Sequence, residues 1–525
     1  MVRTIFYIAS AVAVVVVLSA GGLSYPFFWL FVVVIPLILL GLYDIFLSGH
    51  NVLINYPVIG HLRYAFEFIS PNIRQYFIET NSSGRPFNRL QRDLVVERAE
   101  GKPDALAFGT QYDVNEVGYH RANHSLAPKV VSEEESRVMV GGPACTKPYS
   151  ASRLNISAMS FGALSANAIM ALNNGARIGG FAHNTGEGGI SPYHKAGGGD
   201  LIWQLGTGYF GCRTPDGGFD PDLFRDKSRL DQVKMIEIKL SQGAKPAHGG
   251  VLPAAKITPE IAEIRGVPMG VDCISPPAHR AFSTPQELLQ FVQRLRELSG
   301  GKPIGFKLCV GRRKEFMGIC RAMIETGIKP DFITVDGAEG GTGAAPIEYS
   351  DRLGMPILEG LVFVQNCLVG AGLRDDIKVI ASAKTVSGFD MVLKIALGAD
   401  MVNAARTMMF AVGCIQALRC HLNTCPTGVA TQDHGRARAV DVDLRQLHVA
   451  NYHRATVKSL LELVGAIGLD DVDHLGPRHI YRRVADQTEK TYAEIYDFVP
   501  PNNFLGNDIH AYYKPHWDLA SAAAF

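Results

Sequence analysis

Residues 304–336 read IGFKLCVGRRKEFMGICRAMIETGIKPDFITVD and contain the unit that decides the fold. A short apolar run at 304–310 is followed by a helical pattern at 314–327 and a second apolar run at 332–336. Strands that alternate with helices in this way pair in parallel. The same alternation predicts eight strands, at 154–159, 180–184, 234–240, 270–274, 304–310, 332–336, 379–383 and 401–405.

Eight such units match the size of a closed (β/α)8 TIM barrel, so the predicted fold class is α/β. Helical patterns separate several of the strands, at 164–178, 285–298, 314–327 and 389–397. An open doubly wound sheet is the structural alternative. The connection at 185–233 is long for this class, and we interpret it either as a lid over the site or as a surface excursion.

The loops after the predicted strands contain many glycines and polar residues. Five of them stand out, at 160–162, 184–189, 242–250, 275–277 and 337–343. Active sites of barrels lie at the carboxyl ends of the strands, where backbone N–H groups of such loops can converge on a ligand. Lys307 is a lone cation inside an apolar strand, which is costly unless it meets a bound anion or an internal carboxylate.

Three cysteines lie close together near residue 420. Cys414, Cys420 and Cys425 are spaced C-x5-C-x4-C, and Pro426 follows the last of them, in a chain of 525 residues with nine cysteines. A thiolate cluster with a trailing Cys-Pro is typical of iron–sulfur ligation. The alternatives are a structural zinc site with His421 as fourth ligand, and cysteines that are buried without a ligand.

The N-terminus predicts a membrane anchor. Residues 4–43 contain no charged side chain, and about 20 residues are enough to cross the hydrocarbon core. The run GGLSYP at 21–26 divides this segment into two expected spans, at about 5–23 and 26–47. A cleaved signal peptide over 1–20 is the alternative, and both arrangements leave the rest of the protein in the cytoplasm.

The overall organisation follows from these patterns. We expect two transmembrane helices at 1–50, a linker and lead-in at 51–150, the barrel with its cysteine segment at 151–450 and a helical extension at 451–525. Net charge is +1 without a Lys/Arg-rich stretch, which gives no support to nucleic-acid binding. Nine cysteines do not form an even-numbered disulfide framework, which favours a reducing compartment.

The strand-end loops and the cysteine segment together resemble the FMN-binding synthase domain of glutamate synthase. The segments that carry the resemblance follow the order of that family between about 150 and 435, namely SAMSFGALS at 157–165, NTGEGG at 184–189, QGAKP at 242–246, ISPP at 274–277, GGTGA at 340–344 and the cysteine segment with its tail CPTGVATQ at 425–432. The resemblance implies an oxidoreductase that reduces 2-iminoglutarate, formed from 2-oxoglutarate and ammonia. It also implies FMN in the barrel and a 3Fe–4S cluster held by Cys414, Cys420 and Cys425.

The resemblance further implies roles for individual residues. Lys245 and Arg265 would bind the two carboxylates of the substrate, with Glu187 and Ser275 beside the substrate or flavin. Lys307 would stabilise the negative charge of reduced flavin. The remaining cofactor-binding candidates are Met159, Ser160, Gln242, Gly340 and Gly341. Barrels usually bind phosphate after strands 7 and 8, which makes Ser382, Lys384, Gly388 and Arg406 the phosphate candidates. The family usually has glycines at 383 and 384 and small residues near 406, so here charged side chains are expected to bind the phosphate instead.

The sequence also departs from the family. Val251 stands where the family usually has a glutamine that helps to bind 2-oxoglutarate. We recognise neither a glutaminase domain nor an NAD(P)H-binding unit, so we expect free ammonia and a separate electron donor, either ferredoxin-like or an NAD(P)H-dependent protein. Two other functions stay open: the flavin subunit of a methylamine–glutamate transfer system, and a membrane-tethered electron-transfer protein without a substrate of its own.

Overall fold

The computed structural model describes residues 2–525, which divide into two compact units, one ending at Leu90 and the other running from Gln91 to Phe525. The first unit begins with helix α1 (Val2–Leu23). A 3-10 turn (Tyr25–Leu30) then leads into α2 (Phe31–Phe46). Val2–Leu23 and Tyr25–Phe46 are each long and apolar enough to cross a bilayer, and the break between them falls inside the expected interruption at 21–26.

The ends of this helical pair are tied by side chains. Arg3 near the start of α1 donates from Nε to Ile54 O at 2.6 Å and from Nη2 to Asn55 Oδ1 at 3.0 Å, both in α3 (Asn51–Asn55). Asp44 near the end of α2 is fully buried and accepts from Val58 N at 2.8 Å. Both ends of the pair therefore lie beside residues 54–58, as in an antiparallel hairpin. Helix α4 (Gly60–Ile73) and a π turn (Arg74–Ile78) follow.

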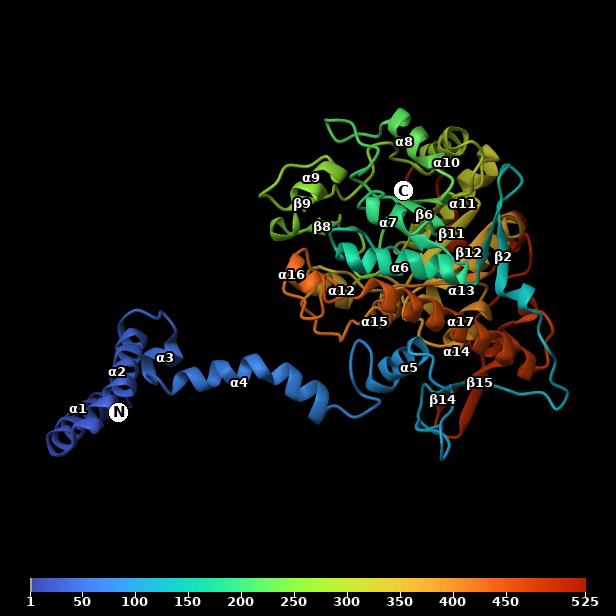
Figure 1. Ribbon diagram of the computed structural model, residues 1–525. Helices are drawn as coiled ribbons and strands as arrows, with labels where there is room; N and C mark the ends of the chain where they lie inside the picture. Colours follow the sequence, from blue (N-terminus) through green and yellow to red (C-terminus); the bar gives the residue numbers. More distant parts are fainter. Residues whose placement is uncertain (1) are drawn as a thin grey trace. The chain divides into compact units, whose positions relative to one another are not determined.

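The second unit contains a closed barrel of eight parallel strands (Figure 1). Neighbouring strands follow one another in chain order around the ring, and β13 closes the barrel against β4. The predicted α/β barrel is therefore confirmed, and the open doubly wound sheet is excluded. The strands are β4 (Leu154–Ile156), β5 (His183–Asn184), β6 (Leu201–Leu205), β7 (Val233–Lys239), β10 (Ile304–Leu308), β11 (Phe332–Asp336), β12 (Lys378–Ser382) and β13 (Met401–Ala404).

One strand was assigned wrongly from the sequence. Residues 273–274 form β9 (Cys273–Ile274), which pairs antiparallel with β8 (Val251–Leu252) in a long excursion after β7. The missing barrel strand is β6, inside the connection that we interpreted as a lid or an excursion. All five residues of β6 are buried, so no alternation of polar and apolar residues marks it, and its Gln204 bonds Glu237 at 2.7 Å.

Helices surround the barrel (Figure 1). The four helices expected from the sequence are found within two residues of their predicted ends, and Ser165 and Thr284 cap two of them by accepting from backbone N–H groups. The outer helices are α6 (Ala166–Gly179), α8 (Pro221–Ser228), α10 (Pro285–Ser299), α11 (Arg313–Thr326), α13 (Ile357–Gly370), α14 (Gly388–Ile395) and α17 (Val442–Ile467). Helix α17 packs against α6 and α14.

The amino end of the barrel is closed by a hairpin of β2 (Arg137–Val140) and β3 (Tyr149–Ser152). Val138, Val140, Tyr149 and Ala151 from the hairpin form one buried cluster with residues near the amino ends of the strands, namely Ala182, Ile202, Met235, Phe332, Ile380 and Met401. The opposite, carboxyl end of the barrel is therefore available for a ligand site.

Shorter elements complete the second unit. β1 (His120–Ala122), β14 (Ile480–Ala485) and β15 (Thr488–Thr491) form a three-stranded antiparallel sheet. The remaining helices are α5 (Arg89–Ala99), α7 (Pro192–Ala196), α9 (Pro259–Arg265), α12 (Ile347–Arg352), α15 (Arg406–Ala411), α16 (His434–Ala437), α18 (Tyr492–Ile495) and α19 (Lys514–Asp518).

Candidate functional site

A layer of buried charged side chains lies at the carboxyl ends of the barrel strands. Lys239, the last residue of β7, donates to Glu187 Oε1 at 2.8 Å and to Gln242 Oε1 at 3.1 Å. Gln242 in turn donates to Gly341 O at 2.8 Å. These contacts join the loops after β5, β7 and β11, and they bring Glu187, Gln242 and Gly341 together as expected for one site. Lys239 was not selected from the sequence, because β7 also contains Lys234 and Glu237 and Lys239 is therefore not a lone charge as Lys307 is.

Lys307 lies inside the barrel, only 6% exposed, with Nζ 3.2 Å from Asp336 Oδ2. Asp336 also accepts from Gly243 N at 3.0 Å. Burial opposes the charge of Lys307, but Asp336 and Glu237 outweigh it and raise the pKa of Lys307 above the ordinary lysine value. The internal carboxylate anticipated as one interpretation of Lys307 is therefore present. An ammonium has three donors, so this contact also leaves capacity for a bound acceptor.

Glu187 lies among three cations. Burial favours its neutral form, but the Lys239 ammonium, with smaller contributions from Lys245 and Arg265, brings the pKa of Glu187 below its ordinary value. A Cβ on either Gly206 or Gly250 would collide with the Glu187 side chain, so glycine is needed at both positions for the carboxylate to lie here. Glu187 is therefore held as an ionised acceptor.

Two buried cations near Glu187 have no carboxylate within 4 Å among residues 2–525. Lys245 is 3% exposed and donates to Ala344 O at 3.0 Å, and burial lowers the pKa of Lys245 to about 8. Arg265 is 5% exposed and donates from Nη2 to Phe161 O at 3.2 Å, while its Nε has no partner among the described residues. Unpaired buried donors are costly, so this pair is suited to an anionic ligand.

The loop after β4 approaches the loop after β5. A Cβ at Gly186 would come within 2.9 Å of Ser160 N and 3.1 Å of Met159 C. Gly186 also has a φ of +64°, so both its space and its backbone favour glycine. Ser275 is buried and donates from its N–H to Gly250 O at 2.8 Å, and Gly250 lies directly against the Glu187 side chain.

The phosphate candidates lie after β11, β12 and β13. Arg406 donates to Glu339 O, in the loop that contains Gly340 and Gly341, and burial lowers the pKa of Arg406 to about 10. Ser382 ends β12, with Oγ 3.3 Å from Ser157 Oγ. Lys384 takes a left-handed φ of +33°.

Gly388 has the least support among the phosphate candidates. Its Cα faces Ser459 and Leu460 of α17 so closely that a Cβ would collide with them. The N–H groups of Val386 and Ser387 donate to the Asp390 carboxylate at 2.8 and 3.0 Å, so an internal anion already caps this helix. The phosphate hypothesis therefore depends on Ser382, Lys384 and Arg406.

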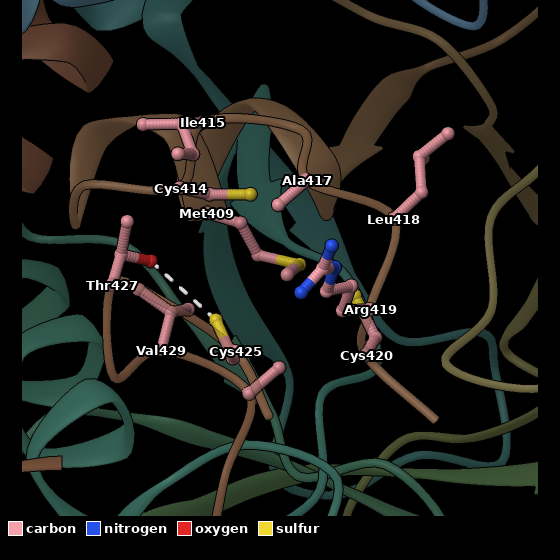
Figure 2. A pocket seen from close by; sticks show the side chains of 11 residues that line it. Met409, Cys414, Ile415, Ala417, Leu418, Arg419, Cys420, Cys425, Thr427 and Val429 are labelled. Carbon is pink, nitrogen blue, oxygen red and sulfur yellow. Dashed lines mark hydrogen bonds between the residues drawn. The ribbon is translucent and has the colours of Figure 1, made fainter. Parts of the chain in front are cut away.

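Cys414, Cys420 and Cys425 line one pocket (Figure 2). Their side chains point into a common space that Met409 and Arg419 also border. Burial raises the pKa of Cys414 to about 12 and also raises that of Cys420. Burial acts in the same direction on Cys425, but the Thr427 hydroxyl and nearby backbone N–H groups outweigh it and lower the pKa of Cys425. The residues present thus fit a cofactor with three thiolate ligands.

A single zinc ion fits this pocket less well. His421 is exposed and does not line it. Across residues 2–525, no three His, Cys, Asp or Glu side chains converge closely enough to hold one metal ion. Zinc–sulfur bonds of about 2.3 Å would require such convergence, whereas the cysteines of a polynuclear cluster are spaced further apart.

Two side chains that the sequence did not single out tie the cysteine segment to the loop after β4. Lys256 donates to Ala163 O at 2.7 Å and to Cys420 O at 3.1 Å. Gln432 donates to Gly162 O at 3.1 Å and to Leu164 O at 2.8 Å. The thiol pocket is thus connected directly to a strand-end loop of the barrel.

The barrel, its buried charge layer and its adjoining thiol pocket define a barrel protein with a candidate ligand site at the carboxyl ends of its strands. A sequence profile described as the conserved region in glutamate synthase matches residues 115–470. The chain therefore belongs to the glutamate synthase family, as a glutamate synthase-like FMN oxidoreductase.

Curated relatives match the chain over different shares of their own length. The glutamate synthase large subunit-like protein YerD of Bacillus subtilis is 38% identical over 83% of this chain and 90% of its own length. An archaeal-type glutamate synthase (NADPH) of Thermotoga maritima is 32% identical over 62% of this chain. The chain spans only 62% of that relative's length.

The solved structures to which the chain is similar are more distant in sequence. A flavocytochrome b2 with sulfite bound covers 85% of this chain and 91% of its own, at 12% identity and a TM-score of 0.43. A mandelate oxidase with (S)-mandelic acid covers 83% of this chain and 98% of its own, at 14% identity and a TM-score of 0.42.

Proposed function

We propose that the protein reduces 2-iminoglutarate, or a closely related imine, to an amino acid at the carboxyl end of its barrel. One observation carries this proposal: the ionised Glu187 lies beside two buried cations, Lys245 and Arg265, that have no carboxylate partner among the described residues. A dicarboxylate with a positively charged iminium nitrogen complements this arrangement of charges. The relatives named as glutamate synthases support the same reaction class.

The roles of the side chains follow from their charge and burial. Lys245 and Arg265 would each bind one carboxylate, Arg265 through its unpartnered Nε and the rest of its planar guanidinium. Glu187, as an acceptor, would orient the iminium N–H and stabilise its charge. Bound FMN, in its reduced form, would supply the hydride that the imine carbon accepts.

The residues at the strand ends would hold this FMN. Met159, Ser160 and Gln242 would contact the ring system from the loops after β4 and β7. Lys307 would place its positive charge toward reduced flavin while Asp336 keeps it ionised. Ser382, Lys384 and Arg406 would hold the phosphate.

We further propose that Cys414, Cys420 and Cys425 hold a 3Fe–4S cluster. Such a cluster supplies one-electron transfer, here from a separate ferredoxin-like or NAD(P)H-dependent protein. A Cys420→Ser variant should lose its iron. Cys145→Ser is the matched control, because Cys145 is also half-buried but lies far along the chain, with Sγ 3.3 Å from Gly301 O. Unchanged iron content in the first variant would contradict the ligand assignment.

The apolar hairpin would anchor the protein in a membrane, with the barrel in the cytoplasm. The contacts of Arg3 and Asp44 near residues 54–58 support a hairpin whose two ends lie on one side. The full-length chain should remain with membranes after an alkaline carbonate wash. Protease added outside intact cells should leave the barrel uncut, and digestion of the barrel would contradict the proposed orientation.

Flavin reoxidation tests the reaction. The purified full-length protein is reduced without oxygen, and the return of flavin absorbance is followed after addition of 2-oxoglutarate with ammonia, 2-oxoglutarate with methylamine, or other keto acids with ammonia. Fastest reoxidation by the first pair is expected. Faster reoxidation with methylamine would favour the methylamine–glutamate transfer function, and no reoxidation by any pair would contradict imine reduction.

A further inference from the structure

Lys256 connects the two proposed cofactor regions through one ammonium group. It closes a 3-10 turn (Ala254–Lys256) in the excursion after β7 and is 2% exposed. Its Nζ donates to Ala163 O at 2.7 Å, in the loop after β4, and to Cys420 O at 3.1 Å, in the cysteine segment. A side chain this buried is expected to have a counter-charge.

Three of the other buried lysines show what a counter-charge looks like in this protein. Lys239 and Lys307 have the carboxylates of Glu187 and Asp336. Lys302 donates to Ser228 O at 2.7 Å and Leu230 O at 2.8 Å, at the carboxyl end of α8, where the helix dipole favours a cation.

Lys256 has neither kind of partner. No carboxylate among residues 2–525 lies within 4 Å of its Nζ, and Ala163 precedes the amino end of α6, whose dipole disfavours a cation. Its Nζ instead contacts the backbone of Cys420, one of three cysteines that become anionic when they bind a metal. The ligated thiolate set is therefore the candidate counter-charge.

We infer that Lys256 is a positioning residue that supplies the positive counter-charge of the iron–sulfur ligand set and holds this set against the loop after β4. The inference rests on the proposed cluster. A cluster with three thiolate ligands is anionic and gains one further negative charge when an iron centre takes one electron from the donor. A fixed cation beside it stabilises the reduced form more than the oxidised form, and thereby raises the reduction potential.

Three variants of the full-length protein test this role. Lys256→Met removes the charge and both hydrogen bonds, Lys256→Arg keeps the charge, and Lys302→Met removes a similarly buried lysine with two carbonyl contacts far from the cysteines. Each protein is analysed for iron and flavin, and the midpoint potential of the cluster is measured by redox titration followed by electron paramagnetic resonance.

In Lys256→Met, the equilibrium constant for cluster reduction should fall about tenfold, which is about 59 mV for one electron. Lys256→Arg should stay closer to the wild-type potential, and Lys302→Met should match the wild type. If Lys256→Met does not retain iron, Lys256→Gln, which removes the charge but keeps a hydrogen-bond donor, is measured in its place, and a potential equal to that of the wild type would overturn the inference.

The possible failures are distinguishable. Iron in the wild type with an unchanged potential in Lys256→Met overturns the role of Lys256 and leaves the proposed function standing. An equal shift in Lys302→Met shows a general effect of losing a buried lysine and likewise overturns it. A wild-type protein with flavin but without iron overturns the proposed cluster, and the inference with it.

Discussion

The two ends of the barrel are built from the same strands but differ in chemistry. At the amino end, residues such as Val140, Met235 and Met401 form an apolar cluster with the β2–β3 hairpin. At the carboxyl end, Lys239 and Lys307 are buried with Glu187 and Asp336. Buried ion pairs often contribute less stability than apolar residues of the same volume. The comparison indicates that one end stabilises the fold while the other keeps charges for a ligand.

Breaking the Lys307–Asp336 pair should have the largest effect. Asp336→Ala leaves a buried ammonium unpaired and removes the acceptor of Gly243 N, so the free energy of unfolding should fall by about 3–5 kcal/mol. The double variant Lys307→Met with Asp336→Leu should recover most of the lost free energy of unfolding. Its flavin should no longer be reduced at the wild-type rate. Denaturant unfolding and flavin reduction measure the two outcomes. If the double variant is as unstable as Asp336→Ala, the pair is needed for the stability of the fold, which would contradict the interpretation that it is kept for a ligand.

A cavity at the amino end should separate stability from cofactor binding. Ile380→Ala, in the apolar cluster, should lower the free energy of unfolding by about 2–4 kcal/mol, because Ile380 is fully buried. The flavin and iron content of the folded protein should be unchanged. Loss of flavin from folded Ile380→Ala protein would show that the two ends are not independent.

Removing one cation from the site should affect binding more than turnover. Lys245→Ala should raise KM for a dicarboxylate about 10- to 100-fold, since a hydrogen bond to a charged group contributes about 1.5–3 kcal/mol. Its control is Lys302→Met, which should leave KM unchanged.

Lys245 also predicts a pH dependence. The pKa of Lys245 is lowered to about 8, so its ammonium is present below this pH and is lost above it. In the wild type, kcat/KM should therefore fall as the pH rises through about 8. In Lys245→Arg, which keeps its charge, this fall should disappear. A fall of the same size in both proteins would assign the titration to another group.

The smallest expected effect concerns Val251 in β8. If the substrate is 2-iminoglutarate, Val251→Gln should lower KM for 2-oxoglutarate with ammonia about 2- to 10-fold, because one neutral hydrogen bond contributes about 0.5–1.5 kcal/mol. A loss of activity toward another keto acid instead would show that valine serves a different substrate.

The sequence predicted the barrel because most strands are apolar runs next to clear helical patterns. It did not predict β6, whose buried Gln204 interrupts its apolar run and bonds a residue 33 positions away. It assigned 270–274 to the barrel because a short run before Ser-Pro-Pro resembles a strand end. Local patterns cannot distinguish a two-residue antiparallel pair in an excursion from a barrel strand.

Within the site, the residues at the strand ends could be predicted from the sequence, but the partners of the charged side chains could not. Glu187, Gln242 and Gly341 could be placed together because parallel strands end at one edge. The partners of the charged residues, such as Lys239 for Glu187 and Asp336 for Lys307, depend on which strands become neighbours when the barrel closes. The contact of Lys256 with Cys420 spans 164 positions, and no spacing within either segment indicates it.

The excursion after β7 has a consequence for how this enzyme can change. Lys245, Arg265, Val251 and Lys256 all belong to that one stretch, between the end of β7 at Lys239 and the start of α10 at Pro285. Grafting this stretch alone between related enzymes would transfer the preference for a reactant and the environment of the redox centre in a single exchange, without altering the strands that enclose them.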